Sequence, residues 1–194
     1  MNKAKLKRMT GIALLMALVV VMQAIGSAIP PVSGFSISLV LIPIVLGAAL
    51  YGPSAGLLLG TTFGVVVFIN CVTGADVGGH MVFQAGPFLC FLVVIGKGAL
   101  AGFASGWVYK LMAKTNGYLA MLLAAIICPV VNTGTFVACM LLFFREVLAA
   151  WAGGADLLTY IFSGLLLMNF VPELIINILF SPAGQRITHI VNKR

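Results

Sequence analysis

Long apolar stretches are the feature that most limits what this chain can fold into. Residues 9–29, 54–73 and 118–144 contain no charged side chain. Each stretch is close to or above the roughly 20 residues that a helix needs to cross the hydrocarbon core of a membrane. The 194-residue chain is 62% hydrophobic and 8% charged, which excludes an ordinary soluble core. We therefore predict an all-α membrane protein that forms one domain over residues 1–194.

Six transmembrane helices fit this pattern, and prolines and glycines mark most of their ends. Pro30 and Pro31 should end the first helix, Gly52 and Pro53 should separate the second from the third, and Pro182 should end the last. A signal peptide is the weaker interpretation of the first stretch, because the apolar run is long and further membrane segments follow. The predicted helices cover about Met9–Ile29, Ser36–Tyr51, Ser54–Thr73, Gln84–Ala113, Tyr118–Phe144 and Leu157–Phe180, with polar loops at 74–83 and 145–156.

The basic residues predict the orientation of these helices. If the amino terminus lies in the cytoplasm, only Arg145 among the basic residues outside the apolar spans falls on the outer side. Basic residues favour the cytoplasmic side of a membrane, so we expect both termini in the cytoplasm and a multi-pass protein of the plasma membrane. The net charge of +7 reflects this bias rather than nucleic-acid binding. The residues on the cytoplasmic side would be Lys3, Lys5, Lys7, Arg8, Lys110, Lys114, Arg186, Lys193 and Arg194.

Lys97 is the only lysine deep inside an apolar stretch. A buried ammonium group costs several kcal/mol unless something pairs with it, and such residues often line the path of a substrate or an ion. The alternative is a structural ion pair with Glu173, the only carboxylate expected at depth. Both interpretations of Lys97 stay open at this point.

Two asparagines are expected at a depth that matches that of Lys97. At 1.5 Å per residue, Lys97 lies about 15 Å and Asn169 about 16 Å below the outer helix ends, with Asn132 in the outer half of its helix. Each asparagine alone could bond a neighbouring helix, but together with Lys97 they favour a substrate-binding site. Gln84 and Trp151, which lie in or beside the predicted outer loops, are further candidates. Trp151 could instead be an aromatic residue of the membrane interface.

Small residues recur at four-residue spacing on three of the predicted helices. Side chains this small let helix backbones approach closely in a membrane. We expect the two glycine series to pack helices against each other within the protein, whereas the alanine pair is of interest because it lies near the cytoplasmic end. The series are Ala13 and Ala17 on the first helix, Gly56, Gly60 and Gly64 on the third, and Gly98, Gly102 and Gly106 on the fourth.

Catalytic signals are missing from the sequence. The chain has four carboxylates, and it contains no HExxH or GxxxxGK[ST] pattern. We therefore predict a protein that is not an enzyme, has no catalytic, cofactor or metal site, and cannot hydrolyse ATP. The four cysteines show no CxxC spacing and are expected to be small packing residues.

The segment Leu41–Gly56, which reads LIPIVLGAALYGPSAG, leads directly into the glycine-rich third helix. Together with the Ala13-xxx-Ala17 pattern, the chain length and the six predicted spans, it resembles the substrate-binding (S) subunits of prokaryotic energy-coupling factor (ECF) vitamin transporters. The resemblance covers most of the chain. It implies one vitamin bound in an outward-open cavity near the outer halves of helices four to six. It also implies docking through Ala13 and Ala17 onto a shared membrane subunit that carries two ATPases.

Two other functions remain open. A stand-alone secondary transporter or channel would use Lys97 and Glu173 as an ion relay, and an intramembrane enzyme or assembly factor is disfavoured by the missing catalytic set. Within the S-subunit interpretation, the family's ligand residues vary with the substrate. A lysine at the cavity suits a carboxylate-bearing vitamin such as pantothenate, while riboflavin, a pyridoxine-type compound and folate also remain open.

Overall fold

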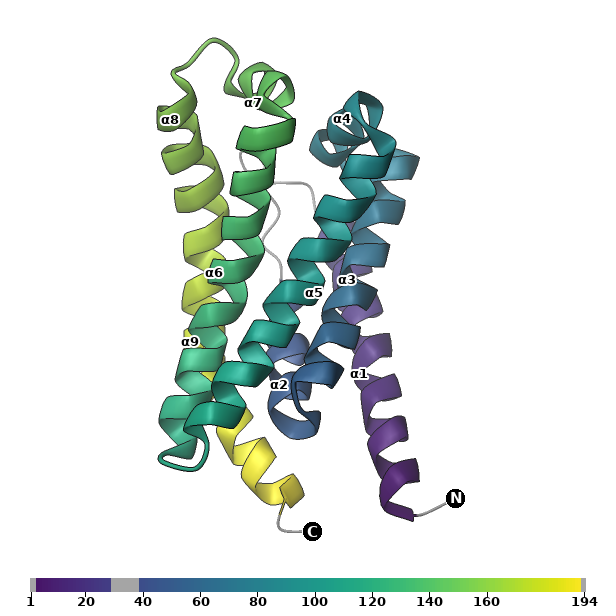
Figure 1. The fold of residues 1–194 in the computed structure, drawn as a ribbon, viewed down its shortest axis with the longest axis vertical. Helices are drawn as coiled ribbons and strands as arrows, with labels where there is room; N and C mark the ends of the chain where they lie inside the picture. The colour runs from purple at the N-terminus through teal and green to yellow at the C-terminus, as the bar shows by residue number, and fades with distance from the viewer. Residues whose placement is uncertain (1–2, 29–38, 193–194) are drawn as a thin grey trace.

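The protein folds as a bundle of long helices that run side by side (Figure 1). The computed structural model describes residues 3–28 and 39–192, and within them it contains helices and turns but no strand. The prediction of an all-α fold is therefore confirmed. The elements are α1 (Lys3–Ala28), α2 (Leu41–Tyr51), α3 (Pro53–Thr73), α4 (Val77–Ala85), α5 (Pro87–Met112), α6 (Gly117–Phe143), α7 (Arg145–Ala152), α8 (Leu157–Tyr160), η1 (Ile161–Phe170) and α9 (Val171–Asn192).

Five stretches in the described part of the chain are long and apolar enough to cross a membrane. They belong to α1, α3, α5 and α6 and to the continuous stretch formed by α8, η1 and α9. The remaining predicted span, Ser36–Tyr51, corresponds to α2, an apolar helix of 11 residues. At 1.5 Å per residue α2 is about 17 Å long, so it is much shorter than the hydrocarbon core of a bilayer.

α2 begins at Leu41 rather than at the predicted Ser36, and residues 29–38 lie outside the described part of the chain. Most of α2 is buried, as expected for a short helix in the core of a bundle. Its end is set by Gly52, whose φ of 92° is a conformation that glycine adopts readily and other residues do not. Pro53 then starts α3, where its missing N–H costs nothing.

Two segments that were predicted to be polar loops form the short helices α4 and α7. α4 begins where the carboxylate of Asp76 accepts a hydrogen bond of 3.0 Å from the backbone N–H of Gly79. α7 buries Leu148 completely and contacts α4. Both helices lie at the end of the bundle away from the start of α1 and the end of α9 (Figure 1).

The last helix continues past Pro182 to Asn192, so the predicted end at this proline is wrong. A proline within a helix removes the N–H that would bond the carbonyl four residues earlier, here that of Ile178. The hydroxyl of Ser181 donates a hydrogen bond of 2.8 Å to that carbonyl oxygen. The missing backbone bond is thereby replaced, and the helix is not broken.

The stretch directly before α9 in the sequence, η1, is wound as a π-helix. The Val171 N–H bonds the carbonyl of Leu166, five residues earlier, which is the hydrogen bond of a π-helix. The π-helical stretch covers 10 residues and ends two residues before Pro172. Such wide winding is rare and occurs often at functional sites.

α3 and α5 are in direct backbone contact along their glycines. A Cβ atom at Gly56 would fall on the carbonyl oxygen of Gly102, and one at Gly60 would fall on that of Gly98, and both relations also hold in reverse. The third glycine of each series likewise lies against backbone atoms of the other helix. The expectation that the glycine series pack helices within the protein is confirmed.

α1 packs against α2 and α3 but leaves much of its apolar surface uncovered. The guanidinium of Arg8 donates a hydrogen bond of 3.1 Å to the carbonyl of Tyr51, which ties the start of α1 to the end of α2. Ala13 and Ala17 are both exposed. The alanine pair therefore does not serve close packing within the described part of the chain.

Candidate functional site

A cavity of about 440 Å³ lies between α1, α3, α5, α6 and the α8–η1–α9 stretch, next to α4 and α7. A volume of this size is typical of pockets that hold a small organic ligand. The cavity combines apolar and aromatic walls with a small number of polar groups. Its polar lining includes Gln23, Asp76, Lys97, Asn132, Thr133, Asn169 and Glu173.

Lys97 lies on the α5 wall of the cavity and is partly buried. Its Nζ atom is 4.5 Å from the ring centre of Phe136 and 5.9 Å from that of Phe63. Both distances are within the range of cation–π interactions. The carboxylates of Glu173 and Asp76 line the same cavity. The rings and the carboxylates together offset part of the cost of an ammonium group inside the bundle.

Asn132 and Trp151, which both line this cavity, each hold a polar atom that is buried. Among the described residues, Asn132 Oδ1 and Trp151 Nε1 have no hydrogen-bond partner. Asn132 is only 6% exposed, and leaving a buried polar atom unpaired costs about 1–3 kcal/mol. A ligand would recover this energy if a movement of the two side chains uncovered Oδ1, which would accept from it, and the Nε1–H group, which would donate to it.

The structure shows which residues surround Trp151. Its indole ring is stacked on Phe136, with the ring centres 6.4 Å apart and the planes at 25°. A Cβ atom at Gly78 of α4 would lie 3.4 Å from the indole ring. Trp151 is therefore packed between α6 and α4 in the cavity wall.

Asn169 and Glu173 line the cavity from the last helix, one turn apart. Glu173 is 3% exposed and Asn177 is 2% exposed, and the Asn177 Nδ2 donates a hydrogen bond of 2.8 Å to the Glu173 backbone carbonyl. The polar stripe on this helix therefore points into the bundle. The structure thus brings four of the five residues predicted from the sequence to one cavity, namely Lys97, Asn132, Asn169 and Trp151.

Gln84 does not join them, because it is not among the residues that line the cavity. It lies on the exposed side of α4, with its Nε2 atom 3.1 Å from Nε2 of His80. His80 in turn places Nδ1 2.8 Å from the carbonyl oxygen of Cys71. The sequence interpretation put Gln84 at the start of α5, but α4 ends at Ala85 and α5 begins only at Pro87.

Several residues of the cavity wall were missed by the sequence analysis. Phe136 follows Asn132 at i+4, so helical spacing from Asn132 could have found it. Thr133 is 5% exposed and directly follows Asn132, a spacing that gives no such signal. Phe63 and Tyr160 also line the cavity. An aromatic residue in an apolar span carries no such signal, because most aromatic residues there only pack.

A comparison with protein families identifies the family of the chain. The family described as ECF transporter, substrate-specific component, matches residues 7–183, which is most of the sequence. The chain belongs to this family. A search of curated proteins found no match to this S component.

Membership in this family fits the cavity. S components are the substrate-binding proteins of a transporter and not enzymes. The family also implies a small-molecule substrate and association with the membrane component and the ATPases of an ECF transporter. The apolar helices agree with a membrane protein.

Proposed function

We propose that this S component binds one vitamin or vitamin precursor in the cavity for ATP-driven uptake across a prokaryotic plasma membrane. The observation that carries the proposal is the ammonium of Lys97 in a cavity that Asn132 and Trp151 also line, each with a buried, unpaired polar atom. A pocket with apolar walls and a few such groups can hold one ligand in a fixed orientation. The proposed ligand contacts are Lys97, Asn132, Asn169 and Trp151.

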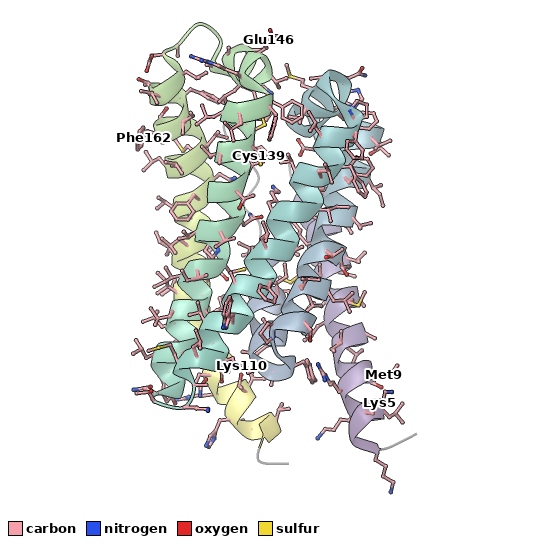
Figure 2. All side chains as sticks on the ribbon, viewed as in Figure 1. Lys5, Met9, Lys110, Cys139, Glu146 and Phe162 are labelled. Carbon is pink, nitrogen blue, oxygen red and sulfur yellow. The ribbon has the colours of Figure 1, made fainter. Side chains whose placement is uncertain are left out.

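The proposed membrane arrangement has six helices, with α2 as the short one, and both termini in the cytoplasm. The start of α1 and the end of α9 lie at the same end of the bundle (Figure 1). Lys5 and Lys110 lie toward that end, and Glu146 lies at the opposite end (Figure 2). The preference of basic residues for the cytoplasmic side supports this orientation. The cavity, next to α4 and α7, is then on the outer side.

The chemistry of the cavity suits a substrate with a carboxylate or another strongly polar acceptor near Lys97. A hydrogen bond to a charged group contributes about 1.5–3 kcal/mol, which corresponds to about 10- to 150-fold in affinity. Pantothenate carries a carboxylate and an amide that could use both Lys97 and Asn132. Riboflavin, a pyridoxine-type vitamin and folate are the other candidates.

Ala13 and Ala17 are proposed to dock onto the membrane subunit of the transporter. Both side chains are exposed on α1, most of whose surface no described residue covers. Small side chains at four-residue spacing permit the close approach of another helix. This surface is separate from the ligand contacts, so docking and binding can be tested independently.

Binding measurements on purified variants test the assignment of Lys97. Pantothenate, riboflavin, pyridoxine and folate are titrated by calorimetry into the wild-type protein, and the vitamin that binds is then titrated into the variants. Lys97→Met should lose about 10- to 150-fold in affinity, and Lys110→Met, at the other end of α5, should bind like the wild type. Adding Glu173→Gln to Lys97→Met should not restore binding.

The rival assignment is a structural pair of Lys97 with Glu173. In that case Lys97→Met would destabilise the protein, because the buried carboxylate would lose its compensating charge. Adding Glu173→Gln would then rescue both the melting temperature and the affinity, and this result would contradict the ligand assignment. Co-purification with ATPase subunits distinguishes the S component from a stand-alone transporter.

A further inference from the structure

Four residues of the last helix line the cavity with a spacing that an α-helix does not produce. They are Tyr160, Leu165, Asn169 and Glu173, which follow one another after five, four and four residues. A regular α-helix repeats every 3.6 residues, so Tyr160 would point about 140° away from Glu173. Tyr160 nevertheless lines the same cavity as Glu173.

The π-winding of η1 accounts for this spacing. η1 lies between Tyr160 and Glu173 and covers 10 residues. A helix closed by hydrogen bonds to the fifth residue has about 4.4 residues per turn. With this winding over η1, Tyr160 comes to within about 40° of Glu173 around the helix axis. The wide winding therefore turns Tyr160 into the cavity.

The exposed side chains of α8 and η1 show a similar spacing, and this observation does not depend on the cavity. Leu158, Phe162 and Leu167 are 62%, 66% and 57% exposed, and they follow one another after four and five residues. All three line a shallow groove on the outer surface. In a regular α-helix Phe162 would lie three turns above Glu173 and would occupy the cavity position. The structure instead places Phe162 outside and Tyr160 inside.

We infer that the π-helical stretch makes Tyr160 a ligand contact that helps to determine substrate specificity, in line with Asn169 and Glu173. The inference rests on the proposed function, in which the cavity binds the substrate. Tyr160 offers a flat apolar ring and a hydroxyl group. It lies nine residues from Asn169, at most about 14 Å along the helix axis. A ligand that reaches both is elongated, which favours pantothenate, riboflavin or folate over the compact ring of pyridoxine.

Cysteine labelling tests, without any ligand, whether Tyr160 faces the cavity. Tyr160→Cys and Phe162→Cys are made in the full chain with the four native cysteines replaced by alanine, and both variants are treated with a charged, water-soluble methanethiosulfonate. Tyr160→Cys should react several-fold faster, because it faces the cavity and Phe162→Cys faces the apolar exterior. Faster labelling of Phe162→Cys is the result that α-winding predicts, and it would overturn the inference. Melting temperatures confirm that both variants are folded.

Binding tests the contact itself. Tyr160→Ala should lower the affinity for the vitamin that binds the wild type by about tenfold. The matched variant Phe162→Ala should leave this affinity unchanged. Tyr160→Phe, which keeps the ring, serves if the alanine variant does not fold, and it should bind more tightly than Tyr160→Leu. Equal affinities of Tyr160→Ala and Phe162→Ala, or of Tyr160→Phe and Tyr160→Leu, would overturn the inference that Tyr160 contacts the ligand. If none of the four vitamins binds the wild type, the proposed substrates fail, and the labelling comparison alone decides the inference.

Discussion

One added methyl group at Gly102 should destabilise the bundle, although alanine is a better helix former than glycine. The new Cβ atom would fall on the carbonyl oxygen of Gly56, 2.6 Å from its carbonyl carbon and 3.1 Å from Ile44 Cγ2. Because the closest atoms are backbone, no side-chain rotation relieves the contact, and α3 and α5 must separate. Overpacking of this kind costs about 1–3 kcal/mol.

Gly96 offers a matched control on the same helix. Among the described residues, no heavy atom lies within 4 Å of the position that a Cβ atom at Gly96 would take. Gly96→Ala and Gly102→Ala gain the same helix propensity, about 0.8–1.0 kcal/mol, so their difference isolates the contact with α3. At about 2–4 °C per kcal/mol for a chain of this length, Gly102→Ala should melt roughly 2–12 °C below Gly96→Ala.

Thermal unfolding of the detergent-purified protein, followed by tryptophan fluorescence, measures this difference. The double variant Gly56→Ala with Gly102→Ala should lose less stability than the sum of the two single variants, because one separation of α3 and α5 relieves both contacts. Equal melting temperatures for Gly102→Ala and Gly96→Ala would refute the backbone contact on which the estimate rests.

Three further outcomes are expected. Ala13→Trp should abolish ATP-driven vitamin uptake while ligand binding stays near the wild-type value, and a parallel loss of binding would show that the alanine packs internally. Single cysteines at Lys114 and Trp151, in a background without native cysteines, should label from opposite sides with an impermeant thiol reagent; labelling of both from outside intact cells would contradict the proposed orientation. Ser181→Ala should lower the unfolding free energy by about 1 kcal/mol, because the carbonyl of Ile178 loses its donor, and an unchanged melting temperature would count against this role.

The long helices could be predicted because their signal is the apolar composition of a whole stretch of sequence. A span must be apolar over about 20 residues to be stable in a membrane, and local residues mark its ends. Pro53 starts α3, and Asn116 caps α6 by accepting hydrogen bonds from the N–H groups of Tyr118 and Leu119 at 2.9 and 3.1 Å. These predictions depend on composition and on residues close in sequence, so they needed no tertiary information.

The short helices could not be predicted because packing outweighs local preference there. Gly78 and Gly79 are poor helix formers and were read as a loop. In the structure, Asp76 caps the start of α4, and a Cβ atom at Gly79 would fall on the Sγ atom of Cys71. Glycine is therefore what lets α4 lie directly on α3, and this reason is visible only once the two segments are packed together.

The polar part of the candidate site could be predicted for a simple reason, and the aromatic part could not. Lys97, Asn132 and Asn169 are rare residue types within apolar spans, so burial alone singles them out. Tyr160 cannot be placed by counting residues, since the sequence carries no obvious signal for ten residues of π-winding and an α-helical count puts Phe162 in the cavity instead.

The walls of the cavity differ in how their residues are fixed. On one side, Lys97 directly precedes Gly98, whose backbone lies against Gly60, so the position of the lysine is set by a contact that leaves no room for adjustment. On the other side, Tyr160 and Asn169 are positioned by the winding of η1. A change of one residue in the length of η1 would rotate these two side chains relative to the lysine by a large angle. If these residues contact the substrate as proposed, we expect substrate choice to depend on helix winding as well as on the identity of the residues.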